Sequence, residues 1–276
     1  MDENDLSEWF VAKPGLKKHA KTLAENFLEP ATMEAVYTEG GRILGDQPTA
    51  KKITDIVGAA IQTAESVWQD LAAESPAFDC HKGCSWCCHQ TVMVIVPEVL
   101  FVKNHIVNTF DLPEIEALKA TLQQRLLEIK GKDNATRQTQ GLACGLLKDS
   151  VCSAHDGRPT MCRGAHSESA QVCHDLFENF HGVVRAISSG ERSAPFLIVP
   201  KMIFNSAQTG MAMALRDVGL ECYSVELTAA LEIALNSPDI EEEWLRDQSV
   251  FAPARLTSVN DRYVTGANGI APAPSE

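Results

Sequence analysis

The chain has 276 residues, of which 45% are hydrophobic and 22% charged, and its formal net charge is -13. This is globular composition, which excludes a largely disordered chain, and the acidic surplus gives no support for nucleic-acid binding. No stretch reaches the roughly 18 consecutive apolar residues of a membrane span, and the acidic N-terminus lacks the basic and apolar regions of a secretory signal. We therefore expect a cytoplasmic protein without a membrane partner.

Most of the chain carries the apolar periodicity of amphipathic helices. The clearest case is residues 49–73, where Thr49 is placed to cap the helix and apolar side chains then recur at helical spacing. Further helices are expected at residues 9–27, 97–107, 113–130, 205–219 and 224–235. We therefore predict a mainly α-helical fold, a helical bundle-like chain with a small cysteine-rich metal-binding subdomain.

Composition changes along the chain and predicts four regions. Residues 1–79 form an N-terminal helical region, residues 80–181 a cysteine-cluster metal-binding domain, residues 182–257 a C-terminal helical region and residues 258–276 a loose tail. Within the second region, residues 91–96 are expected to form a short strand and residues 131–141 a polar, flexible connection. Residues 145–153 are expected to form a short hairpin that turns at residues 148–150.

Residues 80–181 hold eight of the nine cysteines and seven of the eight histidines. In a reducing compartment, such density indicates metal binding or redox chemistry rather than disulfide bonds. Thiolate is a soft ligand, and zinc and iron–sulfur clusters are the centres that suit it best inside cells. We predict eight metal ligands: Cys80, Cys84, Cys87, Cys88, Cys144, Cys152, Cys162 and Cys173. Cys222, outside this region, is expected to be a buried apolar residue.

The spacing of the first four cysteines limits how they could bind one ion. In a continuous helix they would share a face, but Cys80 and Cys88 would lie about 12 Å apart along the axis. Four sulfurs with bonds of about 2.3 Å to one zinc cannot be spread that far. Either Gly83 breaks the helix and folds Cys80 back, or the cysteines serve more than one metal. Adjacent Cys87 and Cys88 are expected to point apart, and eight ligands suit two tetrahedral sites or one polynuclear centre.

Neighbouring side chains have simpler predicted roles. Glu98 is expected to stabilise a helix N-terminus, and Trp86 to shield the site from water. His89 and His155 are candidates for additional ligands. Three cations are expected to offset thiolate charge and to lower cysteine pKa values: Lys82, Arg158 and Arg163.

At these residues the sequence resembles the CxxCxxCC family, often called YkgJ-like, which is described as a zinc- or iron-chelating domain. The resemblance runs from about residue 78 to residue 180. Its matching pieces are Gly83-Cys84-Ser-Trp-Cys87-Cys88, Pro97-Glu98, Cys144-Gly-Leu-Leu-Lys-Asp-Ser-Val-Cys152 and Arg158-Pro159-Thr-Met-Cys162-Arg163, with Ser167 and Cys173 beyond them. The run Cys152-Ser-Ala-His155 departs from the family, which usually places a tyrosine here. A similar cluster occurs in flagellin lysine methylases, which look like iron–sulfur enzymes, so the resemblance permits catalysis.

Two functions remain open, and they differ in the coordination that they require. In the first, an intracellular metal-binding protein holds zinc or an iron–sulfur cluster as a non-catalytic module that binds a protein or peptide partner or passes metal on. In the second, an iron- or iron–sulfur-dependent enzyme modifies a peptide or protein substrate. Closed four-thiolate coordination favours the first and an exchangeable ligand the second. The sequence carries no G-x-S-x-G, P-loop, H-E-x-x-H or dinucleotide-binding motif, so the binding module is the leading interpretation.

Overall fold

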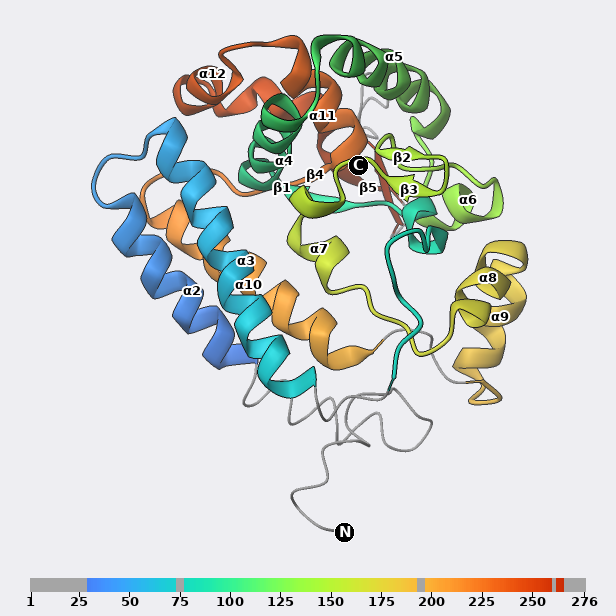
Figure 1. The fold of residues 1–276 in the computed structure, drawn as a ribbon. Helices are drawn as coiled ribbons and strands as arrows, with labels where there is room; N and C mark the ends of the chain where they lie inside the picture. Colours follow the sequence, from blue (N-terminus) through green and yellow to red (C-terminus); the bar gives the residue numbers. More distant parts are fainter. Residues whose placement is uncertain (1–28, 73–76, 193–196, 260–261, 266–276) are drawn as a thin grey trace, which may run out of the picture.

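In the computed structural model, residues 29–72, 77–192, 197–259 and 262–265 are described, and this part of the chain is mainly helical, as predicted (Figure 1). Three long helices form one side of the molecule: α2 (Glu29–Leu44), α3 (Ala50–Ala72) and α10 (Ile198–Asp217). The predicted cap of α3 is confirmed, because the Lys52 backbone N–H donates to the Thr49 hydroxyl at 3.4 Å. The helix predicted at residues 9–27 lies outside the described residues.

Two glycines allow α2 and α10 to cross closely (Figure 1). A Cβ atom on Gly210 would lie 2.3 Å from the carbonyl oxygen of Met33, and one on Gly40 would lie 2.8 Å from the Cβ of Ala214. α10 begins before the predicted residue 205, and it includes Pro200 in its first turn, where a helix tolerates proline.

A second group of helices packs around a two-stranded sheet. The helices of this group are α4 (Val96–Thr109), α5 (Leu112–Ile129), α11 (Leu227–Asn236), α12 (Ile240–Arg246) and the 3-10 helix η5 (Gln248–Ala254). Strands β1 (Met93–Ile95) and β4 (Ser224–Glu226) pair antiparallel with Val94 opposite Val225, and each leads directly into a helix. The strand predicted at residues 91–96 and the helices predicted at 97–107 and 113–130 are therefore confirmed.

The helix predicted at residues 224–235 is wrong at its first three residues, which form β4. The helix α11 begins only after Glu226, because the Glu226 carboxylate accepts the backbone N–H of Ala229 at 2.9 Å and so caps the first turn.

Small elements carry most of the cysteines. They are η3 (Trp86–His89), α6 (Asn134–Thr139), β2 (Leu147–Lys148), β3 (Val151–Cys152), η4 (His155–Gly157), α7 (Thr160–Arg163), α8 (Ala170–Glu178) and α9 (Phe180–Ser188). The predicted hairpin is confirmed as β2–β3, with Asp149 and Ser150 at φ angles of 49° and 61° in its turn. The flexible connection predicted at residues 131–141 is wrong: this segment contains α6, in which Arg137 and Gln138 are buried.

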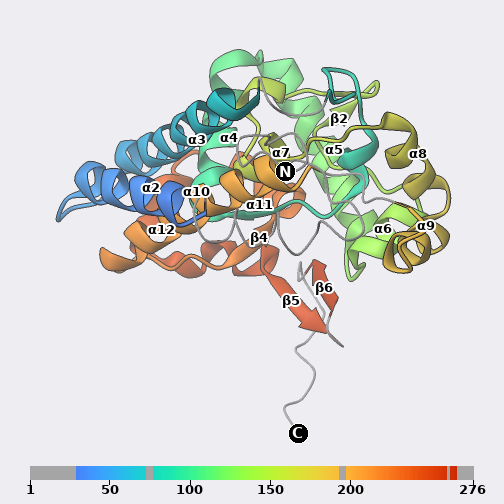
Figure 2. The same ribbon diagram turned by 90° about the horizontal axis from the view of Figure 1, so that it is seen from below.

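One apolar core runs through the described residues and crosses the predicted region boundaries after residues 79 and 181. Its largest fully buried side chains include Trp244, Phe204 and Phe251. Strands β5 (Leu256–Val259) and β6 (Arg262–Thr265) form a separate hairpin, seen projecting from the helices in Figure 2, and the predicted tail begins within it. None of the helices in the described ranges has the length and apolar character needed to cross a membrane.

The crossing of α2 and α10 generates the first prediction. Gly210→Ala should lower the free energy of unfolding by about 1–3 kcal/mol, since the new methyl group would overlap backbone atoms of α2. Gly41→Ala is the matched control: a Cβ there meets no atom of the described residues within 4 Å, and the change should be neutral or stabilise the helix by up to about 1 kcal/mol. Urea unfolding of both variants measures the difference, and equal stabilities would contradict the close crossing.

Candidate metal centre

Six cysteines line one cavity of about 70 Å³: Cys84, Cys87, Cys88, Cys144, Cys152 and Cys162. They come from four stretches of chain, namely the turn before η3 with η3 itself, the loop before β2, the strand β3 and the helix α7. His81, His155 and Arg158 complete the polar part of the wall. All nine cysteines are free thiols. The fold thus brings six of the eight predicted ligands to a common wall.

A glycine turn places the first group of cysteines. The Cys84 backbone N–H donates to the carbonyl oxygen of His81 at 3.0 Å, and Gly83 within this turn has a φ angle of 101°, which glycine adopts without strain. Residues 80–88 are therefore not a continuous helix, and the predicted break at Gly83 is confirmed. Cys87 and Cys88 follow in η3 and both line the cavity, so the expectation that they point apart is wrong.

Cys144 joins the second group of cysteines to the first. Its backbone N–H donates to the carbonyl oxygen of Cys88 at 2.7 Å. Next to it, the Gly145 backbone N–H donates to the Thr228 hydroxyl at 3.1 Å, and that hydroxyl lies 4.0 Å from the Cys144 sulfur. A Cβ on Gly145 would lie 2.5 Å from a methyl carbon of Leu122, so a glycine is needed for the loop to approach α5 and α11 this closely.

A buried carboxylate positions α7, which carries Cys162. One oxygen of Glu98 accepts the Thr160 backbone N–H at 2.9 Å and the Thr160 hydroxyl at 2.6 Å. The other accepts the Ile95 backbone N–H at 3.1 Å and the Gln208 side-chain amide at 2.6 Å. Burial raises the pKa of Glu98, although these hydrogen bonds oppose the shift. Glu98 therefore does more than stabilise the start of α4: it ties α4, α7 and α10 together.

Cys80 and Cys173 meet at Ser167, beside the cavity rather than on its wall. The Ser167 backbone N–H donates to the Cys80 sulfur at 3.1 Å. A hydrogen bond between the Ser167 side chain and Cys173 lowers the pKa of that thiol, against the larger raising effect of burial. Burial raises the pKa of the Cys80 thiol. The negative charges of Cys84, Cys173 and Cys87 in their thiolate forms raise it further. All eight predicted ligands thus belong to one neighbourhood with two parts.

Burial keeps most of these thiols protonated. It raises the pKa of Cys80 and of Cys144 to about 11, and it also raises the pKa values of Cys84, Cys152, Cys162 and Cys173. Cys87 is the exception, because a hydrogen bond with Cys88 lowers its pKa to about 7 while the pKa of Cys88 is raised. A bound cation would replace the protons and favour the thiolate form.

Among the three predicted cations, Arg158 has the predicted role. It lies on the cavity wall, and its charge lowers the pKa values of Cys87, Cys152 and Cys162 against the effect of burial. Arg163 instead forms an ion pair with Glu65 and donates to the Arg158 carbonyl oxygen at 2.7 Å, so it braces α7 against α3. The two histidine candidates also differ in position. His155 lines the cavity, whereas the His89 ring packs on Phe177 with centroids 4.7 Å apart.

A fully buried ion pair stands behind Cys144. The Arg137 guanidinium donates to the Glu226 carboxylate at 2.8 Å, and both side chains have no exposed surface. The Arg137 Nε and Nη2 groups have no acceptor among the described residues, although buried donors are normally hydrogen-bonded. The positive charge of Arg137 lowers the pKa of Cys144, whereas that of Glu226 raises it. This orphaned donor set is compatible with an anionic centre nearby.

The donor chemistry fits a thiolate-bound metal, but the side chains do not converge on a single point. In the described ranges, no group of three or more His, Cys, Asp or Glu residues has the arrangement of a metal site. The cavity is several times larger than the space that one water molecule needs. The wall is therefore wider than the shell of a single ion, and a single zinc would require some thiols to rotate inward.

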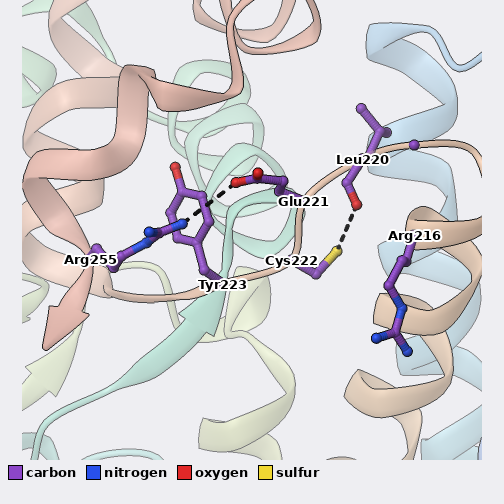
Figure 3. A pocket seen from close by; sticks show the side chains of 7 residues that line it. Arg216, Leu220, Glu221, Cys222, Tyr223 and Arg255 are labelled. Atoms are coloured by element: carbon purple, nitrogen blue, oxygen red, sulfur yellow. Dashed lines mark hydrogen bonds and ion pairs between the residues drawn. The ribbon is translucent and has the colours of Figure 1, made fainter. Parts of the chain in front are cut away.

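A larger depression lies elsewhere, lined by Arg216, Leu220, Glu221, Cys222, Tyr223 and Arg255 with a volume of about 470 Å³ (Figure 3). The Arg255 guanidinium lies 3.7 Å from the Tyr223 ring centroid and 3.5 Å from Glu221. Since the Arg255 and Glu221 side chains are 48% and 65% exposed, these contacts belong to a solvated surface. Burial raises the pKa of Cys222 to about 12, and this thiol packs against the core, as expected for a structural cysteine.

The chain matches no family model, no curated protein and no solved structure. The resemblance to the CxxCxxCC family thus remains a prediction from the sequence. Sequence reasoning also missed Arg137, Thr228 and the role of Ser167, because their partners lie more than eighty residues away along the chain. No local pattern marks such pairs.

The anchoring role of Glu98 generates the second prediction. Glu98→Ala should lower the free energy of unfolding by at least about 2 kcal/mol, because several buried donors lose their acceptor, and it should speed labelling of Cys162 by N-ethylmaleimide. Glu241→Ala is the matched control: it removes another buried glutamate, paired with Lys103 at 2.7 Å, far from α7 along the chain. Mass spectrometry of labelled peptides reads the difference. Slow labelling of Cys162 in both variants would show that Glu98 does not position α7.

Proposed function

We propose that this chain is a metal-binding protein whose cysteine cavity holds an iron–sulfur cluster or zinc, and that it acts as a non-catalytic module for metal or partner binding. The observation that carries the proposal is the common wall formed by six thiols from four stretches of chain. Buried thiols are often inert apolar residues, but such residues do not gather around one cavity with an arginine. The metal ions of a bound centre would balance the negative charge of these thiolates, which Arg158 alone cannot do.

The geometry favours a polynuclear centre over a single zinc ion. Six sulfurs exceed the four that either a closed zinc site or one iron–sulfur cluster uses, so the feature that favours a polynuclear centre is a cavity wider than one ion requires. An iron–sulfur cluster is held by cysteines at its corners and carries negative charge. Arg158 on the wall and Arg137 behind Cys144 are the groups that would offset that charge. All eight predicted cysteines would be ligands: the six on the cavity wall and, beside them, Cys80 and Cys173.

The enzymatic alternative is supported by one feature, the non-cysteine groups of the wall. His81 and His155 line the cavity with the thiols, and the His155 side chain is 24% exposed. A histidine ligand that exchanges with substrate would open a coordination position, as catalytic sites require. This second candidate is distinguished from the first by whether added small ligands change the spectrum of the bound centre.

The third prediction concerns metal content. Protein purified without oxygen should contain bound metal, and an iron–sulfur centre should give a broad visible absorption band together with acid-labile sulfide. Cys162→Ser removes a sulfur from the wall and should lower the metal affinity more than about 10-fold, the smallest loss usually seen when a group supporting a metal ligand is removed. Elemental analysis and the absorption spectrum are the measurements.

Cys222→Ser is the matched control, because Cys222 lies outside the cavity and lines a different depression. It should leave the metal content unchanged. A folded wild-type protein without stoichiometric zinc or iron would contradict the proposed function, as would equal metal contents in the Cys162→Ser variant and the wild type.

A further inference from the structure

We propose that residues 168–192, with helices α8 and α9, form an arm that the metal centre holds closed and that opens when the metal leaves. This inference rests on the proposed function and adds a regulatory movement to it. The arm lies at one edge of the molecule, on the opposite side from α2 and α3 in both ribbon views (Figures 1 and 2).

The arm has little apolar burial of its own. α8 and α9 have nine residues each, and each contains one buried residue, Leu176 in α8 and Val183 in α9. By contrast, ten of the twenty residues of α10 are buried. Isolated helices this short are not stable in water, and two apolar side chains do little to offset the entropy lost when the arm becomes ordered. Its order must therefore depend on what it docks against.

The arm docks on the segment that carries the first cysteines. The Ala170 backbone N–H donates to the Asp79 carboxylate at 2.9 Å, and the Asp79 backbone N–H donates to the Ser167 carbonyl oxygen at 2.9 Å. In the same place Ser167 bonds both Cys80 and Cys173. The base of the arm is thus joined to the candidate metal centre itself, since Cys173 belongs to α8.

Aromatic contacts extend this docking along one face of α8. The Trp86 ring lies 4.7 Å from His174 and 5.5 Å from Phe177 between centroids, and His89 also packs on Phe177. Trp86 and His89 belong to η3, which carries Cys87 and Cys88. Trp86, predicted to shield the site, thus contacts α8, and a change at the cysteines would reach α8 through these rings.

Internal bonds make the arm a unit that moves as one body. Ser169 caps α8 by accepting the Val172 N–H, and Asn179 caps α9 by accepting the Gly182 N–H. Arg192, beyond α9, forms an ion pair with Asp175 of α8 at 2.5 Å. Metal bound by Cys173 and by the cysteines of residues 80–88 would cross-link this unit to the rest of the chain. Without that link, the hydrogen bond to Asp79, the half-exposed aromatic contacts and the contacts of α8 and α9 with α6 remain. Opening breaks these contacts and uncovers Cys80 and Cys84 as a route for metal exchange.

The fourth prediction tests the arm by hydrogen–deuterium exchange of the full chain. Removal of metal with a chelator under reducing conditions should speed exchange in peptides from residues 168–192 by about 10-fold or more. Peptides from α2, α3 and α10 should keep their rates, and reloading with zinc alone should restore slow exchange in the arm. Equal rates in the loaded and stripped forms, or acceleration throughout the chain, would overturn the proposal.

A pair of variants separates the metal link from simple packing. In metal-loaded protein, Cys173→Ser should reproduce the fast exchange of the arm, and Cys222→Ser should not. The metal content of each sample is measured alongside. Wild-type protein that binds no metal contradicts the proposed function and the arm together, whereas wild-type protein that binds metal without slowing exchange in residues 168–192 overturns the arm alone.

Discussion

Thiolates buried together repel one another, and this constraint shapes the region around the cavity. Six cysteines share a wall on which Arg158 is the one charged side chain apart from histidine, among the described residues that line it. Burial accordingly raises the pKa values of nearly all these thiols. A group of thiols arranged in this way has an affinity for metal cations, because a bound cation displaces the thiol protons and its charge stabilises the thiolates. Under the proposed function, this exchange of protons for metal is the reason for the cysteine spacing.

The helical scaffold positions the thiols through a few polar anchors rather than through apolar packing alone. Glu98 bonds α7, α10 and the start of α4, and Thr228 of α11 contacts both Cys144 and Gly145. The buried pair of Arg137 and Glu226 joins α6 to the start of α11. Removing one member of such a pair leaves an uncompensated buried charge. The long helices thus serve to hold short, irregular, cysteine-bearing segments in place.

Much of this fold could be predicted from periodicity and turn chemistry. Residues 49–73 show their helix plainly, because one face is apolar and Thr49 caps it. The hairpin at β2–β3 and the break at Gly83 could be predicted for the same reason: each depends on the local backbone. α6 was missed although Asp133 caps it by accepting the Thr136 backbone N–H at 2.8 Å, because its polar sequence has no apolar periodicity. The burial of Arg137 depends on Glu226, 89 residues away. β4 was not predicted, because Val225 and the apolar residues that follow it also suit a helix. The cap formed by Glu226 sets the residue at which the helix begins.

Within the site, the sequence predicted which cysteines lie near one another. It did not predict that six of them line the cavity and two lie beside it. Cysteine density pointed to eight candidate ligands, whereas the separation of Cys80 and Cys173 from the cavity depends on Ser167 and the docking of α8. X-ray absorption at the metal edge tests the central claim most directly, because it counts the atoms bound to the metal. Our account predicts a shell dominated by sulfur at about 2.3 Å. A shell of nitrogen and oxygen alone at about 2.0–2.2 Å would contradict it.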